Sequence, residues 1–400
     1  MTESTTPRVV IAGGGVAALE TLIALRDLAG DRVDITLVAP GDAFIYRPMT
    51  VAQPFGEGHA RCYELAQIAR SFGARLVSDS VVDVDPEARR VGCQSGEELS
   101  YDHLVLAVGA KARPAYRHAI TFGEDPSEEA LHGLLADMEG GYADHVAFVV
   151  PGGTAWTLPL YEIALMTARQ AWSMGIGRVR FTLVTPEDRP LALFGPAASE
   201  PIGELLEAQG IEFIGSTYAS VSDGHVLLDP GGRQLDGARV VSLPFLDGPD
   251  LPGVPADPSG FIPVDTHGRV PGLDGVYAAG DGTTFPIKQG GLATQQADAV
   301  AEVIAAAVGA RVEPEPFRPV LRGMLLTGGD DRYLRHGVSG GQGEGDVAAQ
   351  ALWWPPAKIA GHYLAPYLFS RDEHLRVQRV ETGYLPVEVT LDLVAGAGRQ

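Results

Sequence analysis

Residues 8–28, RVVIAGGGVAALETLIALRDL, constrain the fold more than any other stretch of the chain. A short apolar strand runs through three glycines into a helical pattern, which gives the spacing GxGxxA at Gly13, Gly15 and Ala18. Gly13 permits the tight turn, Gly15 lets the backbone approach a pyrophosphate, and Ala18 lets helix and strand pack closely. The free amides of the helix N-terminus carry about half a positive charge toward the phosphates. The stretch therefore predicts a Rossmann-like domain that binds a dinucleotide.

Composition narrows the function classes. The 400 residues are enough for two or three domains. A formal net charge of −21 argues against binding nucleic acid, which requires clustered Lys and Arg side chains. The chain has no run of about 18 apolar residues, and its start, MTESTTPRVV, lacks the pattern of a signal peptide. We therefore expect a cytoplasmic protein that touches a membrane at most peripherally.

The two cysteines of the chain, Cys62 and Cys93, form neither a CxxC nor a CxxxxC spacing. A redox-active dithiol and a metal site are therefore not expected. We interpret Cys62 as a packing residue at the start of a helix and Cys93 as part of a hairpin.

Two polar residues after the second predicted strand are candidates for the dinucleotide. The strand at 33–38 continues into Ala39-Pro40, where such folds usually carry an acid for the adenosine ribose. Asp42 is the nearest substitute, with a solvated turn acid as the alternative. Arg47, in DAFIYRP, is a candidate for the pyrophosphate, with a structural salt bridge as the alternative.

Two later stretches carry a resemblance to a known family. YDHLVLAVGAKARP, residues 101–114, is a predicted strand that ends at a turn of small residues, and residues 275–309 combine a strand, a Gly-Asp pair, a loop and a long alanine-rich helix. With the first glycine turn, they make the sequence similar to the two-dinucleotide-fold flavoproteins of the pyridine nucleotide-disulfide oxidoreductase superfamily. Within it, the chain most resembles sulfide:quinone oxidoreductases, flavocytochrome c sulfide dehydrogenases and type II NADH dehydrogenases.

This resemblance covers about residues 8–310 and implies an α/β fold. Two Rossmann-like dinucleotide-binding domains, one for FAD and one NAD(P)-like, would be joined by a smaller C-terminal α+β domain. We expect the FAD-binding domain in 1–115 and 251–310, and the NAD(P)-like domain, with a degenerate glycine motif, in 116–250. Residues 311–400 would then form a C-terminal domain that covers the flavin or makes an interface.

The resemblance also implies FAD as the cofactor and assigns residues to it. Asp281, after Gly280, would accept a hydrogen bond from the ribitol. The helix that starts near Gly291 would point its N-terminus at the pyrimidine ring, where reduced flavin gains negative charge. Lys288 would add a fixed cation that raises the flavin potential, or it is a surface lysine. The remaining positions that we assign to the cofactor are Val82, against the adenine, and the turn residues Ala107 and Gly109.

The second glycine turn, VVPGGTAWTLPLYEIAL at 149–165, departs from the family pattern. Pro151 stands at the first family glycine and Trp156 at the last, where an indole would crowd a pyrophosphate. Trp156 also occupies the position at which sulfide:quinone oxidoreductases carry a catalytic cysteine. Without a thiolate there, sulfide oxidation is not expected. We interpret Trp156 as restricting access to the flavin, with core packing as the alternative. Glu187 is a candidate for holding a ribose, with a turn or capping role as the alternative.

The C-terminal part suggests contacts rather than chemistry. Its aromatic segment, WWPPAKIAGHYLAPYLF, is a candidate for a quinone or peripheral membrane contact, or for a homodimer interface. Residues 339–349, SGGQGEGDVAA, are predicted to form a flexible loop.

We therefore predict an FAD-dependent oxidoreductase that passes electrons from a small donor to a quinone or another small acceptor, without a redox disulfide. One alternative is an NAD(P)H-dependent flavoprotein reductase with a non-standard NAD(P)H pose. Another is a flavin-binding scaffold protein without turnover.

Overall fold

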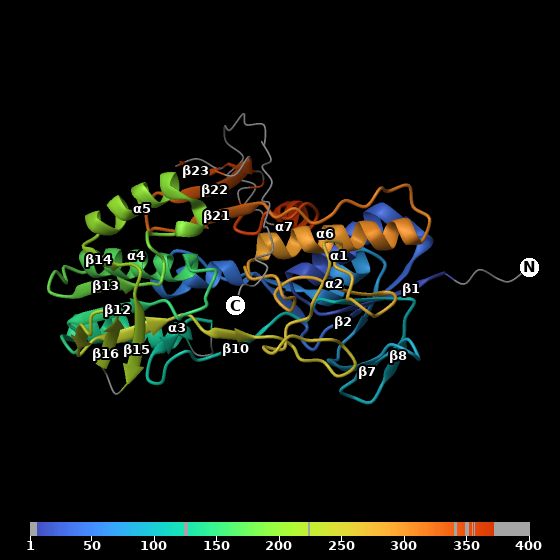
Figure 1. Cartoon of the computed structure of the whole chain (residues 1–400), viewed down its shortest axis with the longest axis horizontal. Coiled ribbons are helices and arrows are strands. Elements are labelled where there is room, and N and C mark those ends of the chain that lie inside the picture. The colour runs from blue at the N-terminus through green and yellow to red at the C-terminus, as the bar shows by residue number, and fades with distance from the viewer. Residues whose placement is uncertain are drawn as a thin grey trace, which may run out of the picture.

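Two lobes and a C-terminal sheet make up the computed structural model (Figure 1). It describes residues 6–123, 127–222, 225–339, 342–348, 352–353, 355 and 357–371. One lobe carries α1, α2 and α6, and the other carries α3, α4 and α5 (Figure 1). The fold confirms the predicted α/β class.

The first lobe is built on a five-stranded parallel sheet in the order β20-β9-β1-β2-β5. Its central strands are buried and apolar, as expected for a parallel sheet covered on both faces. Helices α1 and α6 pack against each other on this sheet, and small alanines allow them to approach closely. The elements are β1 (Arg8–Ala12), α1 (Val16–Ala29), β2 (Asp34–Val38), β5 (Arg75–Val77), β9 (His103–Leu106), β20 (Val276–Ala278) and α6 (Gly290–Ala307).

The second lobe repeats this architecture with a parallel sheet in the order β11-β18-β12-β13-β14. Helix α4 follows β12, so the degenerate glycine turn lies between a strand and a helix, as the sequence predicts. The elements are β11 (Ile120–Thr121), α3 (Ser127–Gly140), β12 (His145–Val149), α4 (Leu158–Ser173), β13 (Arg180–Val184), α5 (Pro196–Ala208), β14 (Ile211–Ile214) and β18 (Arg239–Ser242).

The chain passes between the lobes through the antiparallel pair β10 (Lys111–Arg113) and β19 (Phe245–Asp247). Smaller elements surround the two main sheets. They are β3 (Ala43–Ile45), the 3₁₀ helix η2 (Arg47–Phe55), β4 (Cys62–Glu64), α2 (Leu65–Ser71), β6 (Val81–Asp85), β7 (Arg90–Cys93), β8 (Glu98–Ser100), β15 (Tyr218–Ser222), β16 (His225–Asp229) and β17 (Gln234–Asp236), with the single-turn 3₁₀ helices η1 (Gly30–Arg32) and η3 (Ala192–Phe194).

The C-terminal part adds an antiparallel sheet, β21 (Leu321–Leu325), β22 (Arg332–Ser339) and β23 (Gln342–Ala348), and helix α7 (Leu364–Arg371). The sheet lies against α5 of the second lobe (Figure 1). The prediction of a flexible loop at 339–349 is wrong for residues 342–348, because pairing with β22 holds this glycine-rich segment as a strand. In the described residues, no helix is long and apolar enough to cross a membrane.

Helix α7 is anchored to the first lobe by a buried carboxylate. Glu20, on α1, is fully buried and accepts hydrogen bonds from the backbone amides of Tyr363 and Leu364, at 2.8 and 2.7 Å. These amides begin α7, so the carboxylate satisfies donors that a helix leaves unpaired. This contact fixes the segment before α7, which carries Lys358 toward the site described below.

Candidate functional site

The first glycine turn has the geometry of a phosphate cradle. Gly13 has φ +129°, and its amide donates to the carbonyl oxygen of Val38 at 2.8 Å. A Cβ atom on Gly13 would lie only 2.2 Å from the carbonyl oxygen of Ala107, whereas one on Gly15 would meet nothing within 4 Å. Ala18 is fully buried between helix and sheet. Gly13 therefore closes the turn, and Gly15 leaves open space in front of α1, as a pyrophosphate requires.

The second cofactor turn presents a carboxylate. Gly280 has φ +84°, and its amide donates to Oε1 of the buried Gln296 at 2.6 Å. The next residue, Asp281, is half-buried, and its carboxylate has no hydrogen-bond partner among the described residues. Burial raises the pKa of Asp281, and the nearby Lys288 opposes this rise. A half-buried acceptor without a partner fits a ligand hydroxyl such as those of the FAD ribitol.

Helix α6 begins at the edge of a cavity. The side chain of Gln289 caps it by accepting from the amide of Leu292 at 2.8 Å, and its Nε2 donates to the carbonyl oxygen of Arg322 at 3.1 Å. This side chain therefore ties the helix start, at Gly290 and Gly291, to strand β21. The positive end of α6 thereby faces the same space as Lys288.

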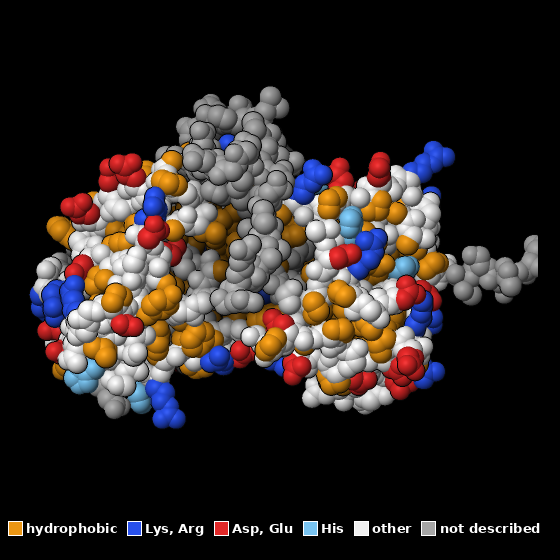
Figure 2. All heavy atoms as spheres, in the orientation of Figure 1, with side chains coloured by type: hydrophobic (Ala, Val, Ile, Leu, Met, Phe, Trp, Pro, Cys, Tyr) orange, Lys and Arg blue, Asp and Glu red, His pale blue; other side chains and the backbone are white. Residues whose placement is uncertain are grey.

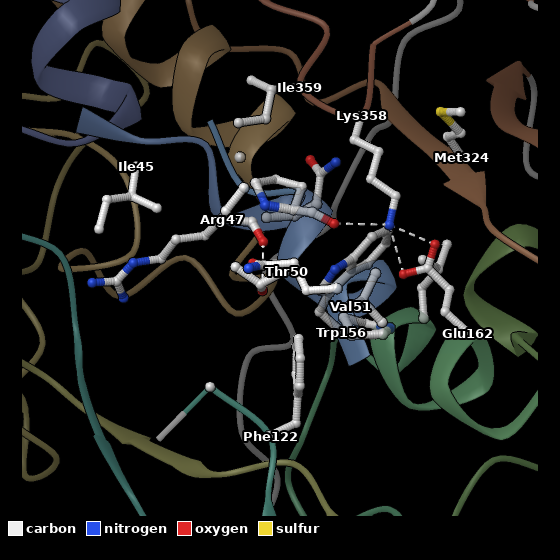
Figure 3. A pocket seen from close by; sticks show the side chains of 18 of the residues that line it. Ile45, Arg47, Thr50, Val51, Phe122, Trp156, Glu162, Met324, Lys358 and Ile359 are labelled. Carbon is white, nitrogen blue, oxygen red and sulfur yellow. Dashed lines mark hydrogen bonds and ion pairs between the residues drawn. The ribbon is translucent and has the colours of Figure 1, made fainter. Parts of the chain in front are cut away.

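The cavity has a volume of about 610 Å³ and lies where both lobes and the C-terminal sheet meet (Figure 3). Apolar and charged groups share its walls, as is usual for sites that bind planar organic molecules. Its lining residues include Arg47, Pro48, Val51, Cys62, Phe122, Leu131, Trp156, Glu162, Lys288, Gln289, Gly290, Arg322, Met324, Lys358 and Ile359.

Lys288 lines this cavity and is held in place. Its Nζ donates to the carbonyl oxygen of Thr283 and lies 3.8 Å from the centre of the Phe261 ring. Burial lowers the pKa of Lys288 to about 8, while Asp281 and Asp257 oppose this change. The side chain is therefore a cation next to the start of α6 at neutral pH.

A second lysine of the cavity lining forms a buried ion pair. Lys358 Nζ lies 2.6 and 2.7 Å from the two carboxylate oxygens of Glu162, and donates to the carbonyl oxygen of Pro48 at 3.1 Å (Figure 3). The two side chains are 7% and 1% exposed. Leu326 donates its amide to the same carboxylate at 2.8 Å. Burial raises the pKa of Glu162, and the charge of Lys358 opposes this rise.

Trp156 faces the cavity and also packs into the second lobe. Its ring lies 6.0 Å from that of Phe194, centre to centre, and it is half-buried against the core. Figure 3 shows it close to Val51 and the Glu162–Lys358 pair. The contact with Phe194 fits the alternative, core packing, and the access role of Trp156 stays a prediction.

The structure places the other predicted residues as follows. Arg47 is exposed, lines the cavity and extends away from the Glu162–Lys358 pair (Figure 3). Ala107 and Gly109 lie at the end of β9, next to the first glycine turn. Asp42 is exposed, and Val82, on β6, is 40% exposed; neither lines the cavity, and their cofactor roles stay predictions.

Several site residues escaped the sequence analysis. No sequence pattern points to the pairing of Glu162 with Lys358, because the two positions lie 196 residues apart. Gln296 gives no signal in an alanine-rich helix. Cys62 was expected to pack at a helix start, which is wrong: it lies on β4, is exposed and lines the cavity.

The C-terminal aromatic segment packs inward where it is described. Trp353 is buried, stacks edge-on against Tyr333 at 5.4 Å and donates to the carbonyl oxygen of Ala357 at 2.9 Å. Tyr367 packs against Phe72. These side chains therefore form no exposed platform; Trp354 lies outside the described residues. Acidic and basic side chains are interspersed over the face in Figure 2.

Comparison with known proteins places the chain among oxidoreductases. The sulfide-quinone reductase of Aquifex aeolicus is 26% identical over 266 residues, which are 61% of this chain and 59% of that protein. An NADH dehydrogenase-like protein of Mycobacterium tuberculosis is 29% identical over 297 residues, 68% of this chain and 72% of that protein. An external alternative NAD(P)H-ubiquinone oxidoreductase of Arabidopsis thaliana is 23% identical over 70% of this chain and 54% of its own length. The chain thus spans less than two thirds of the first and third of these relatives.

Solved structures give the same fold. The sulfide:quinone oxidoreductase of Aquifex aeolicus superposes with a TM-score of 0.77 at 21% identity, covering 86% of this chain and 87% of that chain. A ferredoxin reductase of Rhodopseudomonas palustris gives 0.63 at 20% identity, with 82% of each chain covered.

The family model described as "Pyridine nucleotide-disulphide oxidoreductase" matches residues 7–302, which include both cofactor turns and the start of α6. The predicted oxidoreductase class and the predicted FAD cofactor are thereby confirmed. The chain belongs to the pyridine nucleotide-disulphide oxidoreductase family.

Proposed function

We propose that this protein is an FAD-dependent quinone reductase that works without a redox disulfide. The observation that carries the proposal is the 610 Å³ cavity, whose lining includes the start of α6, Lys288 and the buried Glu162–Lys358 pair. FAD would be held by Gly13, Gly15 and Asp281, and when bound it supplies two-electron chemistry.

The acceptor end of the cavity suits a quinone. Phe122, Leu131, Trp156 and Met324 give it apolar walls, while Lys358 presents a buried ammonium group. A quinone that gains two electrons also needs two protons, and a buried Lys–Glu pair can hold one of them near a carbonyl oxygen. Two of the relatives named above are quinone reductases by name, which supports the same acceptor class.

The proposal that no redox disulfide takes part rests on the positions of the two cysteines. Cys62 and Cys93 are both free and lie on different elements, β4 and β7, and only Cys62 lines the cavity. Trp156 stands where a thiolate would be needed for sulfide oxidation. Electrons would therefore pass between donor, flavin and acceptor without a covalent sulfur intermediate.

The test measures the transfer of electrons from the reduced flavin to the acceptor separately from the reduction of the flavin by its donor. The holoprotein is reduced anaerobically with light and EDTA and then mixed with ubiquinone-1 in a stopped-flow instrument, while the flavin band near 450 nm is followed. We expect rapid reoxidation by ubiquinone-1 and a loss of roughly a hundredfold in Lys358→Met.

Two controls make this result specific. Reoxidation by ferricyanide, which takes electrons without protons, should be unchanged in Lys358→Met. Lys111→Met removes a lysine that lies outside the cavity lining and should react with ubiquinone-1 as the wild type does. A reduced protein that ferricyanide oxidises and ubiquinone-1 does not would refute the quinone proposal. Failure with both acceptors would favour the scaffold alternative.

A further inference from the structure

We propose that the carboxyl groups of Glu20 and Asp298 share one proton, and that this proton holds the segment that carries Lys358 in place. Asp298 is then a positioning residue for Lys358, and it acts through Glu20. The consequence for electron transfer rests on the proposed quinone reduction. The shared proton and the contact that it stabilises do not.

The two carboxyl groups meet where α1 packs against α6. The Asp298 carboxyl, on α6, is hydrogen-bonded to that of Glu20, on α1. A hydrogen bond between two carboxyl groups requires a proton on one of them, because a carboxylate only accepts. Glu20 already accepts from the backbone amides of Tyr363 and Leu364. Glu20 is therefore the ionised acceptor, and Asp298 is the neutral acid that donates to it.

The surroundings of the pair leave no room for a second charge. Glu20 is fully buried, and Oδ1 of Asp298 is buried without a hydrogen-bond partner, although the rest of this side chain is only half-buried. Among the described residues, no Lys, Arg or His forms an ion pair with either group. An orphaned carboxylate oxygen costs far more than the orphaned carbonyl oxygen of a neutral acid. Burial, followed by the charge of Glu20, accordingly raises the pKa of Asp298 well above its usual value.

The nearest charges around the pair are acidic. The charged and titratable groups on the elements packed against it are Asp27 on α1, Glu302 on α6, His362 and Tyr363 before α7, and Arg371 on α7. Arg371 is at the far end of α7, where it lies over the Tyr367 ring, and His362 is exposed. Burial and the surrounding acids raise the pKa of Tyr363 to about 12, so this phenol stays neutral. Glu302 also opposes a charge on Asp298.

Glu20 holds one end of a short strap, residues 358–364, whose other end is Lys358. Only four residues lie between Lys358 and Tyr363. Within them, Ile359 donates its amide to the hydroxyl of Tyr46 at 2.9 Å, and a Cβ atom on Gly361 would lie 2.7 Å from a carboxylate oxygen of Glu20. The strap thus runs directly over the carboxylate and ends at the cavity, so a loss of the Glu20 contact also loosens Lys358.

The sign of the pH effect follows from the neutral form of Asp298. When pH rises and Asp298 gives its proton to water, two adjacent buried carboxylates repel each other, and water must enter to separate or solvate them. The folded state keeps a proton that the unfolded chain releases above about pH 4. The stabilising contribution of Asp298 is therefore complete at low pH and is lost as pH rises through its pKa in the folded state. Alkaline pH loosens the strap and displaces Lys358.

Hydrogen exchange of the holoprotein, followed by mass spectrometry from pH 5 to pH 10, tests the strap without any acceptor. After correction for the intrinsic pH dependence of exchange, we expect a peptide that covers 359–364 to lose protection at least roughly tenfold at alkaline pH. A peptide from α4 should keep its protection, which excludes global unfolding. Asp298→Asn donates to Glu20 at every pH, so its strap should stay protected. Asp27→Asn, which removes an exposed acid of α1, should behave as the wild type does.

Two results would overturn the inference. One is constant protection of the wild-type strap over the whole pH range, which needs no variant. The other is the same alkaline loss of protection in Asp298→Asn as in the wild type.

Ubiquinone-1 connects the strap to Lys358. The ratio of the reoxidation rate of Asp298→Asn to that of the wild type should rise with pH over the range in which the wild-type strap loses protection. The same ratio measured with ferricyanide should stay constant. A constant ratio with ubiquinone-1 would refute the positioning of Lys358 by Asp298. If ubiquinone-1 oxidises neither protein at any pH, the proposed acceptor is refuted, and the exchange experiment still decides whether the shared proton holds the strap.

Discussion

Lys358 binds Glu162 with both carboxylate oxygens within 2.7 Å of its Nζ, although 196 positions separate the two residues. The pair joins the segment before α7 to helix α4, and thus ties the C-terminal part of the chain to the second lobe. Because both side chains are almost fully buried, neither charge can be exposed to water when the other is removed.

The first prediction concerns this pair. Glu162→Gln should lower the free energy of unfolding by about 3 kcal/mol, because it leaves the Lys358 ammonium buried without a counter-charge. The double variant, Glu162→Gln with Lys358→Met, should recover most of the lost free energy of unfolding, because it removes the unpaired charge and because Gln still accepts from the Leu326 amide. Urea unfolding of the wild type, Glu162→Gln and the double variant compares the three free energies of unfolding. A double variant no more stable than Glu162→Gln alone would contradict a charge effect.

The two glycines of the first turn should respond differently to the same change. Gly13→Ala should cost at least about 3 kcal/mol of stability, because its Cβ would lie 2.2 Å from the Ala107 carbonyl oxygen at φ +129°. Gly15→Ala meets no protein atom within 4 Å and should fold normally, yet bind FAD about tenfold more weakly. Circular dichroism and FAD titration of the apoprotein compare the two. Equal FAD affinity in Gly15→Ala and wild type would exclude a pyrophosphate at this turn.

Asp281 should matter for cofactor retention and not for the fold. Its carboxylate has no hydrogen-bond partner among the described residues, although the charge of Lys288 acts on it, so Asp281→Asn removes no hydrogen bond that the apoprotein makes within them. We expect unchanged apoprotein melting and FAD loss on gel filtration for Asp281→Ala, with Asp281→Asn intermediate. Full flavin occupancy in Asp281→Ala would argue against the ribitol role.

Lys288 should set the flavin potential. A cation at the start of α6 favours the negative charge that reduced flavin gains, so Lys288→Met should lower the midpoint potential by roughly 30 mV, equivalent to about 1.4 kcal/mol for two electrons. Lys288→Arg keeps the charge and should stay close to the wild type. Dye-coupled anaerobic titration at pH 7 measures all three. An unchanged potential in Lys288→Met would refute the electrostatic role.

Asp331 should make stability depend on pH. Burial raises its pKa from the usual 3.8 to about 6, Lys358 opposes this rise, and Glu57 adds to it. The folded state therefore holds more protons than the unfolded state between these values, so this group's stabilising contribution falls as pH rises from about 4 to about 6. Asp331→Asn should remove this dependence, whereas Asn at its exposed neighbour Asp330 should not. Melting temperatures from pH 4 to 7 test the difference; a constant offset from wild type across the range would contradict it.

The spacing of residues that are close in the sequence was sufficient to predict much of the first lobe. The strand-turn-helix order at Gly13, Gly15 and Ala18 and the Gly-Asp pair at 280–281 are set by neighbours within a few residues. Backbone conformation at a glycine and packing of a small residue are local requirements, so the sequence predicted the dinucleotide turn, and the family resemblance implied FAD as the cofactor. The departure of Trp156 from the family pattern was equally visible.

Only the tertiary structure decided what surrounds the flavin site. The Glu162–Lys358 pair and the cap of Glu20 on α7 join segments that are 196 to 344 residues apart. Residues 342–348 form a strand because β22 offers them hydrogen bonds. Their own glycine-rich composition does not predict this pairing. Burial and pairing depend on which segments the fold brings together, and a side chain's charge, pKa and access to the cavity follow from those partners rather than from its neighbours in sequence.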